Sequence, residues 1–171
     1  MTELRIWTAR HTTKVAAPPK RVFEVVANVD RWPALLDPLV AVEHLGFDGV
    51  CERVRFATLV DGVTTQDMIM VRELNPKRMQ VRFRQVDVHS PVVTMGGIWL
   101  VVPKGLGSMV ALDHYYRVED NEPAAVARVE REIAAGSASM LAALQQTVEF
   151  GGIPDLIESY PDRGRVRHEA R

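Results

Sequence analysis

Three side chains in otherwise apolar segments have the chemistry to act on a ligand together: Arg72, Trp99 and His114. An arginine is permanently cationic and has five N–H donors, so inside an apolar pocket it could polarise a ketone and stabilise an enolate or alkoxide. A histidine, with a reference pKa of about 6.5, can take up or return a proton near neutral pH. A tryptophan offers a flat wall to a conjugated guest. The set predicts a mostly apolar ligand pocket with a few placed polar groups.

Alternation along the chain groups further side chains with these three, because every second residue of a strand shares one face. We expect the pocket to be lined by residues of four strands and of the final helix. The candidates are Leu39, Gln66, Met68, Met70, Met95, Trp99, Tyr116 and Met140. Methionines at such spacing are more often core residues than ligand contacts, so packing alone is the competing interpretation.

The two candidate catalytic residues also have plainer explanations. Arg72 could pair with a nearby acid such as Glu73 or Asp67, and His114 could be a core histidine whose hydrogen bonds are satisfied. Tyr116 could simply pack with its hydroxyl at the edge of the core. Trp32, beside a proline, is interpreted as structural.

The elements that must position these residues follow from the order of apolar patterns and turn signals. An opening strand is predicted at 7–15, a helix from about Pro19 to Asn28, and a short helix at 31–36 capped by Asp30. Glycine- and proline-containing turns then separate six predicted strands. They are 39–45, 51–60, 63–74, 79–88, 92–102 and 109–119. Short turns between consecutive strands predict an antiparallel meander.

The period changes after the last strand, where apolar residues recur every three or four positions from Val126 to Val148. This spacing predicts one long amphipathic helix, ended by Gly151 and Gly152. The expected class is α+β: a curved antiparallel seven-stranded sheet around the long final helix, two short helices after the first strand, and an interior cavity. We expect the first strand to pair with the last, one domain over 1–158, and a disordered tail over 159–171.

Composition excludes several classes of function. A formal net charge of -1 gives no electrostatic case for binding nucleic acid, and the single cysteine, Cys51, cannot form an internal disulfide or a thiolate metal site. The histidines show no metal-site spacing, and no nucleotide fingerprint or serine-nucleophile motif is found, so neither metal nor cofactor is expected. No segment has the roughly 18 apolar residues of a membrane span or the pattern of a signal peptide, so the expected location is the cytoplasm.

Several sequence strings resemble the aromatase/cyclases of bacterial type II polyketide synthases. These strings lie at 15–18, 22–29, 32–36, 42–43, 71–76, 81–85 and 112–116, with Pro91 and Trp99 between them. The resemblance covers roughly Thr8 to Gln146. The first strings are shared by the wider START-like, Bet v 1-like superfamily and identify its helix-grip fold, whereas those around Arg72 and His114 are more particular.

The resemblance implies a protein that takes a poly-β-ketone from an acyl carrier protein, folds it in an interior cavity, and closes and dehydrates one ring. It also implies that Arg72 is central to activity, Trp99 lines the cavity and His114 faces the substrate. The chain departs from the family where some members have a tyrosine at 39, tryptophans at 66 and 68, and an acidic residue at 140. A binding protein without turnover, or a cyclase acting on a later ring, therefore remains as an alternative.

Overall fold

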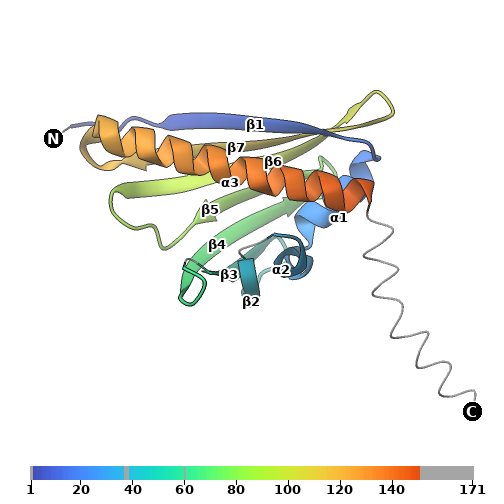
Figure 1. The fold of residues 1–171 in the computed structure, drawn as a ribbon, viewed down its shortest axis with the longest axis horizontal. Coiled ribbons are helices and arrows are strands. Elements are labelled where there is room, and N and C mark those ends of the chain that lie inside the picture. The colour runs from blue at the N-terminus through green and yellow to red at the C-terminus, as the bar shows by residue number, and fades with distance from the viewer. Residues whose placement is uncertain (1, 37–38, 60, 151–171) are drawn as a thin grey trace, which may run out of the picture.

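The computed structural model describes residues 2–36, 39–59 and 61–150, and its strands form one antiparallel sheet (Figure 1). The strands are β1 (Trp7–Val15), β2 (Leu39–Phe47), β3 (Cys51–Leu59), β4 (Thr65–Asn75), β5 (Gln80–Gln85), β6 (Val92–Lys104) and β7 (Gly107–Val118). Their order in the sheet is β1-β7-β6-β5-β4-β3-β2. The predicted meander is confirmed, as is the pairing of the first strand with the last, in which Ala9 lies opposite His114.

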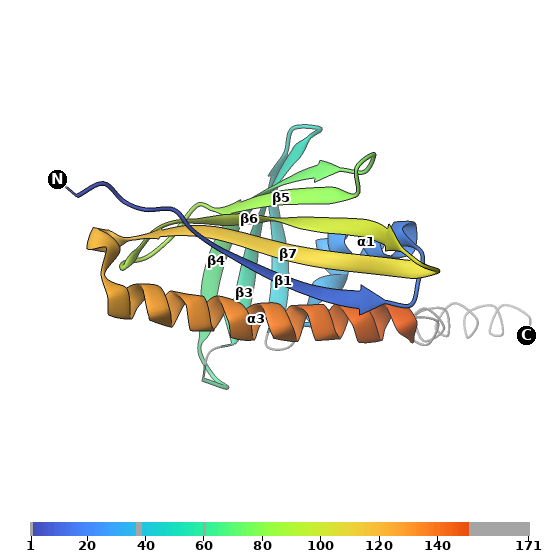
Figure 2. The same cartoon turned by 90° about the horizontal axis from the view of Figure 1, so that it is seen from above.

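The long helix α3 (Pro123–Glu149) runs along one face of the sheet next to β1 and β7, while β3 and β4 pass below it and cross its direction in the view from above (Figures 1 and 2). The short helices α1 (Pro19–Ala27) and α2 (Trp32–Leu35), joined by a 3-10 turn at Val29–Arg31, lie near the C-terminal end of α3. A second 3-10 turn, Glu119–Asn121, leads from β7 into α3. The helix-grip architecture predicted from the sequence is confirmed.

The space between the sheet and the helices holds two apolar clusters. The larger, cluster A, includes Trp32, Trp99, Leu112 and Leu144 and lies where α1, α2 and the end of α3 meet the sheet. The smaller, cluster B, joins β7 to the first half of α3 and consists of Tyr116, Val118, Ala125, Val126, Val129 and Ile133. Burial of these side chains is what holds the amphipathic helix α3 against the sheet.

The predicted cap of the short helical segment was wrong. Asp30 does not cap it. Instead, the side chain of Asn28 accepts a hydrogen bond from the backbone N–H of Asp30 at 3.2 Å. The carboxylate of Asp30 lies 2.5 Å from Nε2 of His44 on β2. Asp30 lies inside the 3-10 turn Val29–Arg31 and so is not at its cap position, and α2 begins without a side-chain cap.

Strand β5 ends three residues earlier than the predicted Val88. The carboxylate of Asp87 accepts the N–H of Ile69 at 2.8 Å, so a side chain takes the place of a backbone acceptor there. Other described boundaries differ from the prediction by one or two residues. The predicted tail at 159–171 and the glycines expected to end α3 lie outside the described residues.

Candidate ligand pocket and its polar groups

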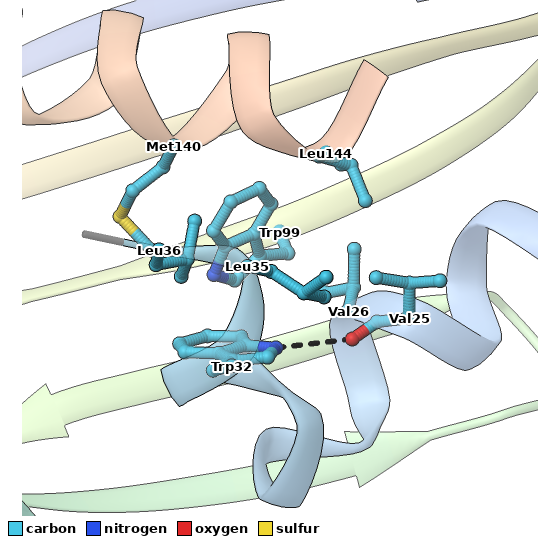
Figure 3. A pocket seen from close by; sticks show the side chains of 8 residues that line it. All are labelled: Val25, Val26, Trp32, Leu35, Leu36, Trp99, Met140 and Leu144. Carbon is cyan, nitrogen blue, oxygen red and sulfur yellow. Dashed lines mark hydrogen bonds between the residues drawn. The ribbon is translucent and has the colours of Figure 1, made fainter. Parts of the chain in front are cut away.

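An apolar pocket lies between α1, α2, β6 and the last third of α3 (Figure 3). Its cavity volume is about 20 Å³, so the pocket is narrow in this structure. Its lining residues are Val25, Val26, Trp32, Leu35, Leu36, Trp99, Met140 and Leu144. All eight are apolar, so the pocket suits a hydrophobic guest and offers it no charged group.

Trp32 forms one wall of this pocket, and its ring is held from three directions. Its Nε1 donates a hydrogen bond to the carbonyl of Val25 at 3.0 Å, which Figure 3 shows as a dashed line. The ring stacks on Phe56 of β3 at a centroid distance of 5.6 Å and meets Trp99 edge-on at 6.2 Å. The sequence interpretation gave Trp32 only a structural role, and the structure adds a place in the pocket wall.

Arg72 is almost completely buried, at 1% exposed, and does not line the pocket. Its Nη2 donates to the carbonyl of Val26 at 2.6 Å, and its Nη1 donates to the carbonyl of Ala27 at 3.1 Å and to the carboxylate of Glu52. Its guanidinium carbon lies 5.1 Å from the centre of the Trp32 ring. Arg72 therefore ties the C-terminal end of α1 to β3 and β4.

The charge of Arg72 is balanced inside the protein. Burial lowers the pKa of Arg72 to about 10, and the attraction of Glu52 opposes that shift, so the guanidinium stays cationic at neutral pH. Glu52 lies directly opposite Arg72 in the ladder between β3 and β4. The acid that pairs with Arg72 is therefore Glu52, rather than Glu73 or Asp67 of its own strand.

His114 lies on the inner face of β7 and is partly buried. Burial, together with the neighbouring His11, lowers the pKa of His114 to about 4, although Asp113 acts in the opposite direction. Phe83 of β5 meets the imidazole edge-on at 5.4 Å. Within the described part of the chain, Nδ1 of His114 is buried without a hydrogen-bond partner. At neutral pH the ring is therefore neutral, and one of its nitrogens is available to a ligand.

Tyr116 belongs to cluster B, on the opposite side of His114 from the apolar pocket. Its side chain is 2% exposed. Burial and the nearby Glu130 raise the pKa of its phenol. In this arrangement Tyr116 packs β7 against the first half of α3.

The remaining candidates are divided between the pocket, the core and the surface. Trp99 and Met140 line the pocket. Leu39 and Met70 pack against cluster A without lining the pocket, and Met95 packs against cluster B. Met68 is partly buried on β4, and Gln66 is exposed near the start of that strand. The structure thus brings only two of the eight expected lining residues into this pocket.

Sequence reasoning missed six of the lining residues and the acid that holds Arg72. The missed lining residues are Val25, Val26, Trp32, Leu35, Leu36 and Leu144. Five of them lie on helices and Leu36 directly follows α2, so the apolar faces of the three helices were the signal available for them. Glu52 carried a signal too, because alternation places it at the start of the inner face of β3, in line with buried Val54 and Phe56.

The described residues hold no group of three His, Cys, Asp or Glu side chains placed to bind a metal ion. Among the described helices, none combines the length and the apolar character needed to cross a membrane.

Comparison with known proteins gives one family match over almost the entire described fold. The profile of the family described as "Polyketide cyclase / dehydrase and lipid transport" matches residues 7–149. The granaticin polyketide synthase bifunctional cyclase/dehydratase of Streptomyces violaceoruber is 38% identical over 165 residues, which are 95% of this chain and 51% of that protein. The actinorhodin counterpart of Streptomyces coelicolor is 34% identical over 157 residues, 91% of this chain and 49% of that protein. The chain thus spans about half the length of these curated relatives.

Solved structures share the fold. The di-domain ARO/CYC BexL is 33% identical, with a TM-score of 0.76 over 84% of this chain and 46% of that one. The Zhui aromatase/cyclase from Streptomyces is 24% identical, with a TM-score of 0.76 over 85% of this chain and 94% of that one. Norcoclaurine synthase from Thalictrum flavum, 20% identical with a TM-score of 0.70 over 86% of this chain and 97% of that one, has the same fold.

Proposed function

The chain belongs to the polyketide cyclase/dehydrase and lipid transport family, and from this premise we propose that it is an aromatase/cyclase of polyketide biosynthesis. In the proposed reaction the protein binds a poly-β-ketone between the sheet and α3, directs one aldol cyclisation, and removes water to give an aromatic ring. The observation that carries the proposal is the similarity to a bifunctional cyclase/dehydratase along 95% of the chain. No metal or organic cofactor is part of the proposal.

The pocket supports this function because its walls are apolar and partly aromatic. A free poly-β-ketone can close several different rings, so a protein that holds one folded geometry with the reacting carbons in contact favours one product. The two tryptophans, Trp32 and Trp99, would flank the guest. The cavity volume of about 20 Å³ is far below the roughly 300–1,000 Å³ usual for ligand pockets, so the pocket must widen substantially when the chain enters.

His114 is the proposed proton carrier. Its neutral imidazole would take a proton from a methylene between two ketones, and the resulting enolate carbon would attack a ketone carbon to form the new bond. The imidazolium would then return the proton to the alkoxide, which leaves the imidazole neutral again. In the dehydration, the imidazole would take a proton from the carbon next to the ketone, the electron pair of that C–H bond would form the C=C bond, and the imidazolium would protonate the departing hydroxyl so that it leaves as water. Because burial lowers the pKa of His114 to about 4, the imidazolium gives up its proton readily at neutral pH, while the same shift makes the neutral imidazole a weaker base in the first step.

Arg72 is proposed to act in two ways. Its three hydrogen bonds, to Glu52 and to the carbonyls of Val26 and Ala27, fix the end of α1 that forms part of the pocket wall. An arginine has five N–H groups, so two remain beyond these bonds to polarise a ketone and stabilise the developing oxyanion. The guanidinium lies behind the Trp32 ring and outside the pocket lining, so a ketone would reach it only after the pocket has widened past Trp32.

The partner in this proposal is an acyl carrier protein that bears the poly-β-ketone, and the reaction would take place in the cytoplasm. The chain spans about half of its curated relatives, and the proposal gives it one cyclisation and one dehydration.

The experiment is product analysis by liquid chromatography and mass spectrometry after reconstitution of a minimal polyketide synthase. The mixtures contain wild-type protein, His114→Ala, Arg72→Ala, the exposed control Arg82→Ala, or no added protein, and circular dichroism checks the fold of each variant. Wild type and Arg82→Ala should shift the spontaneous products to one cyclised aromatic, while folded His114→Ala and Arg72→Ala should not. Identical mixtures with and without wild type, over several chain lengths, would contradict the proposal.

A second candidate is a helix-grip protein that binds a hydrophobic small molecule without converting it. The observation in its favour is that all eight residues lining the pocket are apolar. This function predicts that a bound polyketide is recovered unaltered after incubation. It also predicts that the products of the synthase do not depend on the protein.

A further inference from the structure

A layer of polar side chains separates the two apolar clusters beneath α3. On β7, His114 lies between Leu112 of cluster A and Tyr116 of cluster B, two residues from each on the same face. On α3, Ser137 lies one turn after Ile133 of cluster B and one turn before Leu141 of cluster A. Residues four apart on a helix share a face, so Ser137 faces the sheet together with Ile133 and Leu141. Ser137 of α3 and His114 of β7 therefore both lie at the boundary between cluster A and cluster B.

Ser137 is the most deeply buried member of this layer, at 2% exposed. Its hydroxyl has no hydrogen-bond partner among the described residues. A serine inside a helix can point to solvent or donate to the carbonyl four residues earlier, and the buried hydroxyl of Ser137 does neither here. Burying an unpaired hydroxyl is unfavourable, so this position is costly to the fold unless something else binds the hydroxyl.

Two histidines on adjacent strands complete the layer. His11 of β1 lies opposite Leu112 in the ladder with β7, which places it diagonally next to His114 on the inner face. Within the described ranges, Nδ1 of each imidazole is buried without a hydrogen-bond partner. The proximity of the two rings is also visible in the lowering of the His114 pKa by His11.

The layer adjoins the apolar pocket rather than standing apart from it. Met140, a lining residue, follows Ser137 by three positions on α3 and therefore shares its face. Trp99, another lining residue, lies opposite Leu112, and Gly97 of the same strand lies opposite His114. A guest that extends from the pocket along β7 and α3 toward cluster B would therefore meet Ser137, His11 and His114.

We propose that Ser137, His11 and His114 form a binding position for one oxygen atom of an otherwise apolar guest. A serine hydroxyl donates and accepts, and a neutral imidazole offers one donor and one acceptor nitrogen, so together they match a hydroxyl or an enolised ketone. The inference rests on the proposed function in one respect: the class of guest, a ring or folded chain that carries oxygen, is taken from it. It gives Ser137 and His11 a role in orienting that guest.

The test compares two probes that differ by one group: β-naphthol and β-methylnaphthalene, which has a methyl in place of the hydroxyl. Isothermal titration of the full chain measures the affinity ratio for wild type, Ser137→Ala and Ser139→Ala. Ser139 is an exposed serine two residues further along α3 and serves as the matched control. One hydrogen bond corresponds to about a fivefold change in affinity.

We expect wild type and Ser139→Ala to bind β-naphthol about fivefold more tightly than β-methylnaphthalene, and Ser137→Ala to lose that preference. Alanine is the best helix former, so Ser137→Ala should melt at or above the wild-type temperature, which shows that the loss is not unfolding. The inference is overturned if wild type shows no preference, or if Ser137→Ala keeps it. Failure of the proposed cyclase function would appear separately, as unchanged synthase products with an intact hydroxyl preference.

Discussion

The guanidinium carbon of Arg72 lies 5.1 Å from the centre of the Trp32 ring, so a buried cation of β4 contacts a wall of the apolar pocket. The same guanidinium binds the carbonyls of Val26 and Ala27 at the end of α1 and the carboxylate of Glu52. A single side chain thus connects two strands of the sheet to the helices that enclose the pocket. Its contributions to stability and to ligand binding can be separated by mutation.

Arg72→Ala should lower the free energy of unfolding by about 3–5 kcal/mol, because it leaves the carboxylate of Glu52 buried without its partner. The measurement is urea unfolding followed by tryptophan fluorescence. The double variant Arg72→Met with Glu52→Leu should recover a large part of the loss, because no unpaired charge remains. Arg82→Ala, at an exposed position of β5, is the control and should change stability by no more than about 0.5 kcal/mol. A loss in Arg72→Ala as small as in the control would show that the pair does not hold α1.

The pairing of Arg72 shows how far sequence reasoning could reach. Alternation placed Arg72 on the inner face, which is correct, and the same alternation places Glu73 and Asp67, an odd number of residues away, on the outer face. The true partner, Glu52, lies on the preceding strand, and its position opposite Arg72 depends on the register of the β3–β4 hairpin. That register is a tertiary property that alternation alone does not specify.

The pocket was predicted less well than the fold. The order of turns and of segments with strand-like or helix-like apolar spacing was enough to predict the sheet and α3, because both depend on local patterns. Trp99 and Met140 were placed correctly, but most of the wall comes from α1 and α2, whose contribution depends on how they pack against α3. Trp32 could have been suspected, since it is a large aromatic residue on a short helix, and its ring packs between Phe56 and Trp99.

Met140→Trp should fill the pocket and abolish the effect of the protein on polyketide products. Met140 lines the pocket from α3, and a larger ring there would occupy the space intended for the guest. Ser139→Trp places the same ring on the exposed side of the helix and should leave the products unchanged. The readout is product analysis in the reconstituted synthase. If both variants act like wild type, the guest does not use this pocket.

His114 should make the protein sensitive to mild acid. The pKa of His114 is about 4 in the folded protein and near the ordinary 6.5 in the unfolded chain, so the unfolded chain binds the proton first as the pH falls. Stability is therefore lost between pH 6.5 and pH 4, by up to about 3 kcal/mol, and is retained above that range.

The check is unfolding free energy against pH for wild type, His114→Gln and the exposed control His89→Gln. His114→Gln should remove the loss between pH 6.5 and pH 4, while His89→Gln should follow wild type. Parallel curves for wild type and His114→Gln would mean that the imidazole is not held neutral by its surroundings.

Two glycines provide a final test, because alanine should act in opposite directions at them. A Cβ at Gly97 would overlap the carbonyl oxygen of Asp113 and lie 2.6 Å from Cζ of Phe83, whereas a Cβ at Gly136 meets no atom within 4 Å. Gly97→Ala should therefore destabilise the protein by about 1–3 kcal/mol through overpacking. Gly136→Ala, within α3, should stabilise it by about 0.5–1 kcal/mol, because glycine is a poor helix former.

Gly97→Ala should also change function, because the ring of Phe83 that it would displace is the one that meets His114 edge-on at 5.4 Å. A shifted Phe83 would turn the imidazole away from the guest. We therefore expect Gly97→Ala to alter the product distribution under conditions where it is still folded, while Gly136→Ala leaves that distribution unchanged. Urea unfolding gives the stabilities, and the reconstituted synthase gives the products. A folded Gly97→Ala with wild-type products would separate the Phe83–His114 contact from catalysis.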